Sequence, residues 1–222
     1  MNDDSVRNEL LKLIQSADRV KAVDLLREWG DVHGYNRLLV DILEPTLQTV
    51  GKAAAAGGEF TFADGYVAAR VTEDLMEYAA ESLKNTSEQP RLGRVVVIGN
   101  IEDDYHALGR RILGIYLNAY GWEVHDLGND VLAEQFVDMA LEVGAKIVGA
   151  SAMMHTTAMN ILKLREEIDR RNLKGKLQLA VGGAIFVVRP ELIEAVGGDG
   201  TCSNAIYAHE LFERLWQMAE RS

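Results

Sequence analysis

The chain has 222 residues, of which 48% are hydrophobic and 26% charged, and its formal net charge is −11. This length suffices for one large or two small domains, and the composition is that of an ordinary globular protein. The acidic balance disfavours a nucleic-acid partner, because a phosphate backbone needs a basic face. A single cysteine, Cys202, excludes an internal disulfide and fits a reducing compartment. With no membrane-length apolar run and no signal-like start, we expect a cytoplasmic protein without a membrane partner.

The first part of the chain predicts four amphipathic helices with short connections, which favours a four-helix bundle over residues 1–86. The helices are expected around Val6–Ile14 and over 18–29, 35–56 and 62–83. Asp18 is expected to cap the start of the second helix, and Gly30 to end it. Pro45 lies within the third helix and predicts a kink or a break there.

A polar segment at 85–92 predicts a linker, and beyond it strands and helices alternate through 92–222. Strands are expected at 94–99, 122–127, 146–151 and 177–181, with a short fifth strand near Thr201. Helical sequence separates them and also ends the chain. Such alternation predicts an α/β domain with a parallel sheet covered on both faces, in a flavodoxin/Rossmann-like, doubly wound, five-stranded form.

Three short motifs follow three of the predicted strands. They are D-x-H-x-x-G at 104–109, S-x-M at 151–153 and G-G at 182–183. Because the carboxyl ends of parallel strands share one edge of a sheet, where ligands bind, we expect the motifs to meet at one rim. Imidazole is a good ligand for a late first-row metal such as cobalt. Asp104 is well placed to hold the second ring nitrogen of His106.

Together the motifs resemble the cobalamin-binding signature of methionine synthase and of the small corrinoid proteins of methyl-transfer systems. The resemblance implies that the cofactor's own benzimidazole leaves cobalt and His106 replaces it, the base-off/His-on state. It implies that Asp104 supports His106 and that the hydroxyl of Thr157 completes this relay. Ser151 would contact the displaced benzimidazole, and glycines would leave room for the nucleotide tail. The remaining implied cofactor-binding positions are Gly109, Met153, Gly182 and Gly183.

The likeness extends over nearly the whole chain. Residues 151–159 and the helical stretch 43–51 resemble the corresponding parts of corrinoid proteins that partner methanol, methylamine and aryl-ether methyltransferases. There a helical domain caps the upper cobalt face, so Phe60, Phe62 and Tyr66 are candidates for that cap, although ordinary packing explains them equally well. The side chains of Met153 and Met154 are expected to serve packing.

Two positions depart from the family pattern. Ala107 stands where an aspartate usually follows the histidine, and Arg110 stands in place of a lysine. These changes leave the ligand histidine intact but loosen the match to any one characterised partner.

The resemblance implies a corrinoid-binding methyl carrier. Such a protein shuttles a methyl group between a substrate methyltransferase and an acceptor methyltransferase that serves tetrahydrofolate or a thiol, with a reductive activator as a further partner. No nucleophile–base constellation is visible, so we expect no catalysis by the chain alone. The alternatives are a cobalamin-dependent sensor or regulatory protein, a subunit of a radical mutase, and a flavodoxin-like domain that binds no cobalamin.

Overall fold

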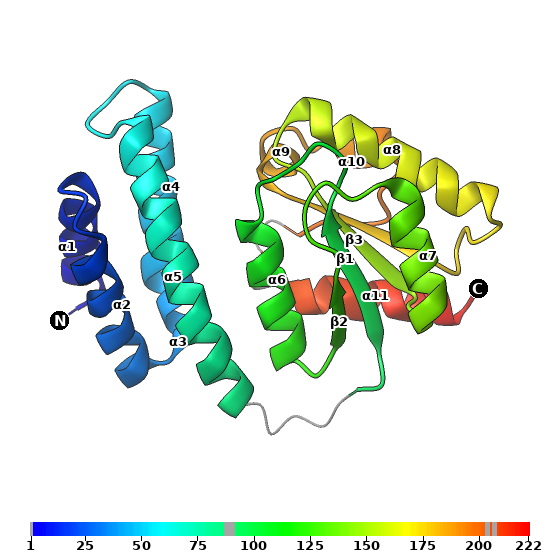
Figure 1. The fold of residues 1–222 in the computed structure, drawn as a ribbon, viewed down its shortest axis with the longest axis horizontal. Coiled ribbons are helices and arrows are strands. Elements are labelled where there is room, and N and C mark those ends of the chain that lie inside the picture. The colour runs from blue at the N-terminus through cyan, green and yellow to red at the C-terminus, as the bar shows by residue number, and fades with distance from the viewer. Residues whose placement is uncertain (1, 87–91, 203–204, 206–207) are drawn as a thin grey trace. The chain divides into compact units, whose positions relative to one another are not determined.

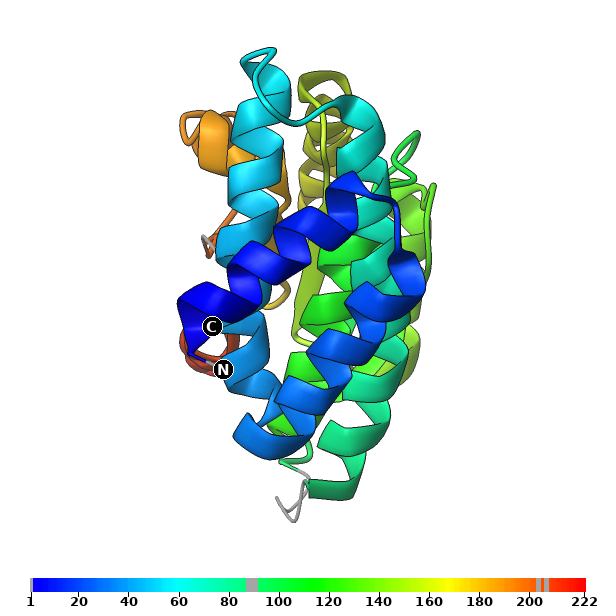
Figure 2. The ribbon, with the colours of Figure 1, turned by 90° about the vertical axis from the view of Figure 1, so that its left-hand side faces the viewer.

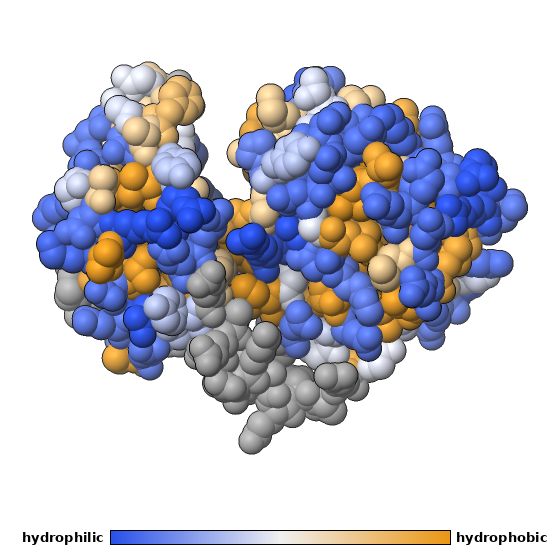
Figure 3. Space-filling model, in the orientation of Figure 1, coloured by the Kyte–Doolittle hydropathy of each residue, from blue (hydrophilic) through white to orange (hydrophobic). Residues whose placement is uncertain are grey.

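The computed structural model describes residues 2–86, 92–202, 205 and 208–222. The chain divides into two compact units, Met1–Thr86 and Ser87–Ser222 (Figure 1). Most of the predicted linker lies outside the described residues. Among the residues described, no helix is long and apolar enough to cross a membrane. On the face drawn in Figure 3, each unit shows hydrophilic residues with smaller apolar areas among them.

The regular elements in the described part of the N-terminal unit are all helices (Figure 2). Its elements are α1 (Asp3–Gln15), α2 (Arg19–His33), α3 (Tyr35–Arg37), the π-helix η1 (Leu38–Leu43), α4 (Glu44–Ala55) and α5 (Phe62–Thr86). Backbone angles at the junctions of α3, η1 and α4 are helical, so these three form one continuous stretch. Pro45 lies in the first turn of α4, where its missing N–H is tolerated, and the expected irregularity takes the form of the π-helix before it.

The start of α2 is as predicted, but its end is not. The side chain of Asp18 accepts a hydrogen bond from the backbone N–H of Lys21 at 3.2 Å, which confirms the cap. The helix continues through Gly30 and ends at Gly34, whose φ is 89°. A Cβ at Gly30 would lie 3.0 Å from a methyl of Leu38, so this glycine permits close packing and does not stop the helix.

The second unit contains a parallel sheet in the order β2-β1-β3-β4. Its strands are β1 (Val95–Asn100), β2 (Glu123–Asp126), β3 (Ile147–Ser151) and β4 (Gln178–Gly182). The helices are α6 (Leu108–Ala119), α7 (Ala133–Val143), α8 (His155–Arg170), α9 (Ala184–Val188), α10 (Leu192–Ala195) and α11 (Ala208–Glu220). The predicted α/β class with a parallel sheet is confirmed.

The prediction of a fifth strand near Thr201 is wrong for the described residues. A single parallel bridge joins Ala180 to Gly200, and residues 203–204 and 206–207 lie outside the described part. The carboxylate of Asp199 accepts the backbone N–H of Leu179 at 2.7 Å. A side chain therefore takes a ladder position that a strand's carbonyl would occupy, and regular pairing does not develop.

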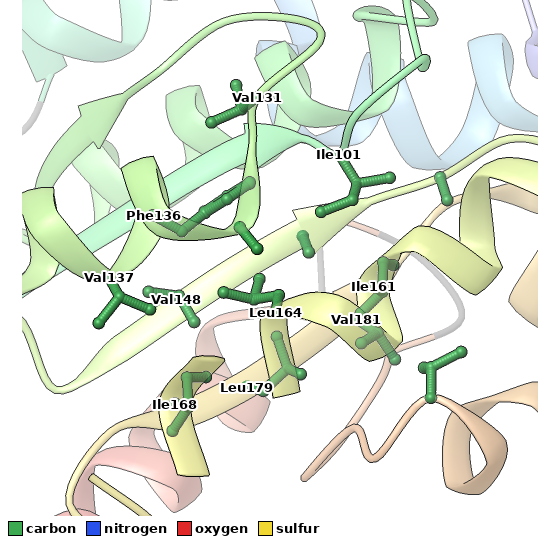
Figure 4. Packing of buried hydrophobic residues seen from close by; sticks show 14 of the residues in the cluster. Ile101, Val131, Phe136, Val137, Val148, Ile161, Leu164, Ile168, Leu179 and Val181 are labelled. Atoms are coloured by element: carbon green, nitrogen blue, oxygen red, sulfur yellow. The ribbon is translucent and has the colours of Figure 1, made fainter. Parts of the chain in front are cut away.

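Each face of the sheet is covered by a pair of helices around an apolar layer. α7 and α8 pack on side chains of β1, β3 and β4, with Phe136, Val148 and Leu164 fully buried (Figure 4). α6 and α11 cover the other face. A Cβ at Gly99 would lie 2.7 Å from the Phe136 ring, so β1 needs a glycine just before its end. This packing positions the end of β1, where the loop of the predicted site begins.

Candidate functional site

The loop at 101–107, between β1 and α6, is braced from the segment after β2. Asp103 has a left-handed backbone with φ 66°, and its N–H donates to the carboxylate of Asp130 at 2.9 Å. The hydroxyl of Tyr105 donates to the other oxygen of that carboxylate at 2.7 Å. The N–H of Asp130 donates to the carbonyl of Asp104 at 3.1 Å. These three hydrogen bonds tie the loop to Asp130. The carboxylate of Asp104, in the middle of the loop, points into the protein.

Asp104 is completely buried, and four hydrogen bonds converge on its carboxylate. One oxygen accepts from the side-chain amide of Asn100 at 2.8 Å and the N–H of His106 at 2.9 Å. The other accepts from the N–H of Met153 at 2.7 Å and the hydroxyl of Thr157 at 2.9 Å. Burial favours a higher pKa, but these hydrogen bonds outweigh it and set the pKa of Asp104 below its ordinary value. The group is therefore a buried anion at neutral pH.

The imidazole of His106 lies beside this anion at the surface of the rim. Its Nδ1 is 3.4 Å from a carboxylate oxygen of Asp104, longer than an ordinary hydrogen bond, and 55% of its side chain is exposed. Because Nδ1 faces the carboxylate, Nε2 lies on the opposite edge of the ring. The arrangement orients the imidazole and leaves Nε2 as a ligand for a metal.

His106 would have to serve a metal whose other ligands come from elsewhere. Within the described parts of the chain, no three His, Cys, Asp or Glu side chains group together to hold an ion. One exposed imidazole backed by a carboxylate fits a cobalt ion already held by a macrocycle, which needs one axial donor from the protein.

A cavity of about 230 Å³ opens beside the rim, between the ends of β3 and β4 and the helices α6, α9 and α11. Its walls are mainly apolar and include Leu113 and Phe212. Gly109 and Gly182 line it, and a Cβ added to either would meet no atom within 4 Å. The volume is below the roughly 300 Å³ at which pockets begin to enclose whole ligands. The cavity is therefore large enough for a part of a cofactor, and its lining favours an apolar part.

Gly183 also lines the cavity, but the fold itself explains this residue. Its φ is 110°, and a Cβ there would lie 2.0 Å from the backbone oxygen of Ala152. The N–H of Ala152 donates to the carbonyl of Gly182 at 2.9 Å, so the two chain segments are in direct backbone contact. A side chain at Gly183 would clash with the backbone of Ala152 whether or not a ligand fills the cavity.

The structure brings the remaining predicted positions to the same rim, with one difference. Ser151 ends β3 and lines the cavity, and Thr157 lies in the first turn of α8. The side chains of Met153 and Met154 are 45% and 55% exposed, so the prediction that they serve packing is wrong. They follow β3 where the chain leaves the sheet, and only the backbone of Met153 engages Asp104.

The predicted cap residues lie in the helical unit and differ in exposure. Phe60 is buried within that unit, whereas Phe62 and Tyr66 are 83% and 69% exposed. Packing within the unit therefore accounts for Phe60 but not for the other two side chains.

Sequence reasoning missed a second polar cluster next to Asp104. Arg110 is only 5% exposed, and its Nε donates to the amide oxygen of Asn100 at 2.7 Å. Its two other nitrogens bond to carboxylate Asp126 and, at 3.1 Å, to the amide oxygen of Asn129. A polar residue closing the apolar run of β1 was the available signal, because a buried amide must find partners.

Comparison with known proteins identifies the family of the α/β unit. A family model described as a B12 binding domain matches residues 94–212, more than half of the chain. The chain belongs to this family of B12-binding domains. The predicted resemblance to corrinoid proteins is thereby confirmed.

Two curated relatives are corrinoid proteins. One, from Desulfitobacterium hafniense (strain Y51), is 37% identical over 132 residues, which is 60% of each chain. Another, trimethylamine corrinoid protein 1 of Methanosarcina mazei, is 36% identical over 119 residues, or 54% of each chain. The matched region thus spans between half and two thirds of these relatives.

The fold of the whole chain also has a solved counterpart. The structure of the monomethylamine corrinoid protein of Methanosarcina barkeri matches with a TM-score of 0.83, covering 96% of this chain and 100% of that one. The two sequences are 23% identical, so this likeness is one of fold.

Proposed function

We propose that the chain binds a corrinoid such as cobalamin, with His106 as axial ligand of cobalt, and carries a methyl group between two methyltransferases. The observation that carries the proposal is the exposed imidazole backed by the buried anion Asp104, beside an apolar cavity, within a B12-binding domain. The bound corrinoid supplies the methyl-accepting and methyl-donating chemistry, as cofactors do in such systems.

The chain's own contribution begins with orientation of the ligand. Asp104 faces Nδ1 of His106, which favours the tautomer that carries its proton on Nδ1 and presents a bare Nε2. Thr157 and the N–H of Met153 hold the far oxygen of that carboxylate, so the anion cannot turn away. The relay predicted from the resemblance thus has compatible geometry, and its role toward cobalt is part of this proposal.

The cavity is proposed to receive the nucleotide arm in the base-off state. Gly109 and Gly182 leave its entrance open, and Ser151 places a hydroxyl on a wall that is otherwise mainly apolar. Gly183 contributes indirectly, because it allows the backbone to turn tightly at the end of β4. An aromatic base would be desolvated there without leaving many polar groups unpaired.

The substrate and partners follow the names of the relatives. A trimethylamine corrinoid protein is among them, so we propose a methylamine-class donor delivered by a separate methyltransferase. The acceptor is proposed to be tetrahydrofolate or a thiol on a second methyltransferase, and a reductive partner would restore oxidised cobalt.

A methyl-transfer experiment tests this function. The full chain is loaded with hydroxocobalamin, reduced, and incubated with a methyltransferase encoded beside its gene and ¹⁴C-labelled mono-, di- or trimethylamine, with labelled methanol as a parallel arm. We expect label from one amine to elute with the chain in a near-stoichiometric amount. Failure of every donor, and of methyl iodide, to label the loaded chain would contradict a carrier role. Light-dependent oligomerisation of the chain loaded instead with adenosylcobalamin, without methyl labelling in the first experiment, would indicate the regulatory alternative.

A further inference from the structure

We propose that Arg110 and Asn100 are positioning residues that lock the His106 loop in the conformation offered to the corrinoid. This inference rests on the proposed function and deepens it. It concerns the side of Asp104 away from Thr157, and it links the rim loop to the segment that follows β2.

Asn100 connects Arg110 to the loop that carries His106. It is the last residue of β1 and is completely buried. Its side-chain amide nitrogen donates both to the carboxylate of Asp104 at 2.8 Å and to the backbone oxygen of His106 at 3.2 Å. It therefore contacts the ligand residue and the residue that orients it. A flip of this amide would turn its oxygen toward both acceptors and replace two attractions by two repulsions.

Arg110 fixes the orientation of that amide. Its Nε donates to the amide oxygen of Asn100 at 2.7 Å, and an arginine nitrogen can only donate. The amide oxygen must therefore face the guanidinium, and the amide nitrogen must face Asp104. A cation on one side and an anion on the other also polarise the amide in the same sense, which strengthens both bonds.

The guanidinium is itself anchored by the last residue of β2 and by the segment that follows this strand. Its terminal nitrogens bond to the carboxylate of Asp126 and to the amide of Asn129, so each of its three nitrogens has an acceptor. The carboxylate of Asp126 also accepts the N–H of Gly128 at 2.9 Å, and the carbonyl of Gly128 accepts the N–H of Asn100 at 2.9 Å. The charge of Arg110 is thus neutralised in place by a chain segment tied back to β1.

If Arg110 and Asn100 had a purely structural role, replacing them would change stability alone. A positioning role predicts a change in how His106 binds cobalt. Apart from its bond with Arg110, the side-chain amide of Asn100 bonds only to Asp104 and to the backbone of His106 among the hydrogen bonds of the described residues. Removing Arg110 would leave the Asn100 amide oxygen buried without a partner and allow the amide to rotate. The loop would then sample conformations in which the imidazole is displaced from the position proposed for binding cobalt.

The test is hydroxocobalamin binding to the full chain, followed by absorption spectroscopy, in Arg110→Met. Changes around a metal-bound histidine cost about 10-fold or more in affinity, so we expect about 10-fold weaker binding. We also expect a bound fraction whose spectrum lacks histidine ligation. Arg111→Met is the matched control, because it removes the same charge from the next, exposed position of the same helix. It should leave affinity and spectrum unchanged.

Two further variants keep the test decisive. Arg110→Lys retains a charge but cannot satisfy three acceptors, so it should restore part of the histidine-ligated spectrum. Asp126→Asn preserves shape at a part-exposed site and removes the counter-charge, so it should fold even where Arg110→Met does not. We expect it to weaken binding in the same direction by a smaller factor.

The outcomes separate this inference from the proposed function. If the unaltered chain shows no histidine-ligated spectrum, the proposed function itself fails. If the unaltered chain binds in this way and both Arg110→Met and Asp126→Asn match it in affinity and spectrum, the positioning role is overturned, whatever happens to their melting temperatures.

Discussion

Two regions of the α/β unit are built on opposite principles. The layer between the sheet and α7 and α8 is a cluster of buried apolar side chains, among them Phe136, Val148 and Leu164 (Figure 4). At the end of the same sheet, the rim buries Asp104 and Arg110, and every buried polar group named there has a specific partner.

Because of this difference, the two regions should tolerate different kinds of amino-acid substitution. An apolar layer accepts substitutions of similar volume and loses stability in proportion to the space vacated. A buried polar network depends on the identity and orientation of each donor and acceptor, so isosteric changes are damaging there. The layer sets the stability of the fold, and the rim sets the geometry of the ligand.

Gly183→Ala should have the largest effect on stability, because the added methyl group would clash with the backbone of a neighbouring segment at the rim. The new Cβ would lie 2.0 Å from the oxygen of Ala152 at a φ of 110°. We expect a loss of more than about 5 kcal/mol in the free energy of unfolding, measured by urea denaturation. Gly182→Ala is the matched control, since its Cβ meets nothing within 4 Å. Equal stability of the two variants would contradict this account of the turn.

Phe136→Ala probes the apolar layer. Its ring is completely buried under Gly99 and Val131, so truncation leaves a cavity between the sheet and α7. We expect a loss of about 3–5 kcal/mol in unfolding free energy, with the histidine-ligated corrinoid spectrum retained in the folded fraction. A normal stability together with an altered spectrum would reverse the assignment of roles to layer and rim.

Asp104→Asn probes the rim at nearly constant volume. Its amide nitrogen would face one pair of the donors that now converge on the carboxylate, so we expect a loss of about 2 kcal/mol at pH 7. Because the folded-state pKa of Asp104 is lowered, its contribution is present above the unfolded value of about 3.9 and is lost as pH falls through the folded value. The difference from wild type should therefore shrink in acid. A constant difference down to pH 2 would contradict the ionised assignment.

Glu167→Gln should have the smallest effect and calibrates the others. Hydrogen bonds from Arg170 and then Arg171 lower the pKa of Glu167 from 4.5 to about 2. Its contribution is thus present above pH 4.5 and disappears as pH falls toward 2. Thermal melts between pH 7 and pH 2 should show a small difference from wild type that closes over this range, with corrinoid binding unchanged. Weakened binding would show that α8 transmits strain to the rim.

Local patterns in the sequence were enough to predict where the site lies. Apolar runs and their spacing placed the first four strands, and the rule that parallel strands share a carboxyl edge brought residues 104–109, 151–153 and 182–183 together. The contact between Thr157 and Asp104 was implied only by the resemblance to the cobalamin-binding signature.

Features that depend on tertiary approach were not predictable. Gly30 has the sequence context of a helix end, yet close packing against Leu38 keeps it inside α2. Among the described residues near the predicted fifth strand, Gly200 makes only an isolated bridge to β4, and the side chain of Asp199 takes one of the ladder positions. The partners of Arg110 come from the ends of β1 and β2 and from the segment after β2, and no local pattern links these positions.

The most direct test of the central claim is the absorption spectrum of hydroxocobalamin bound to His106→Ala. His155→Ala serves as its control, since this histidine is exposed at the start of α8 and no cobalt contact is proposed for it. We predict that wild type and His155→Ala give the same histidine-ligated spectrum and that His106→Ala loses it, with weaker binding. An unchanged spectrum in a folded His106→Ala protein would contradict the account.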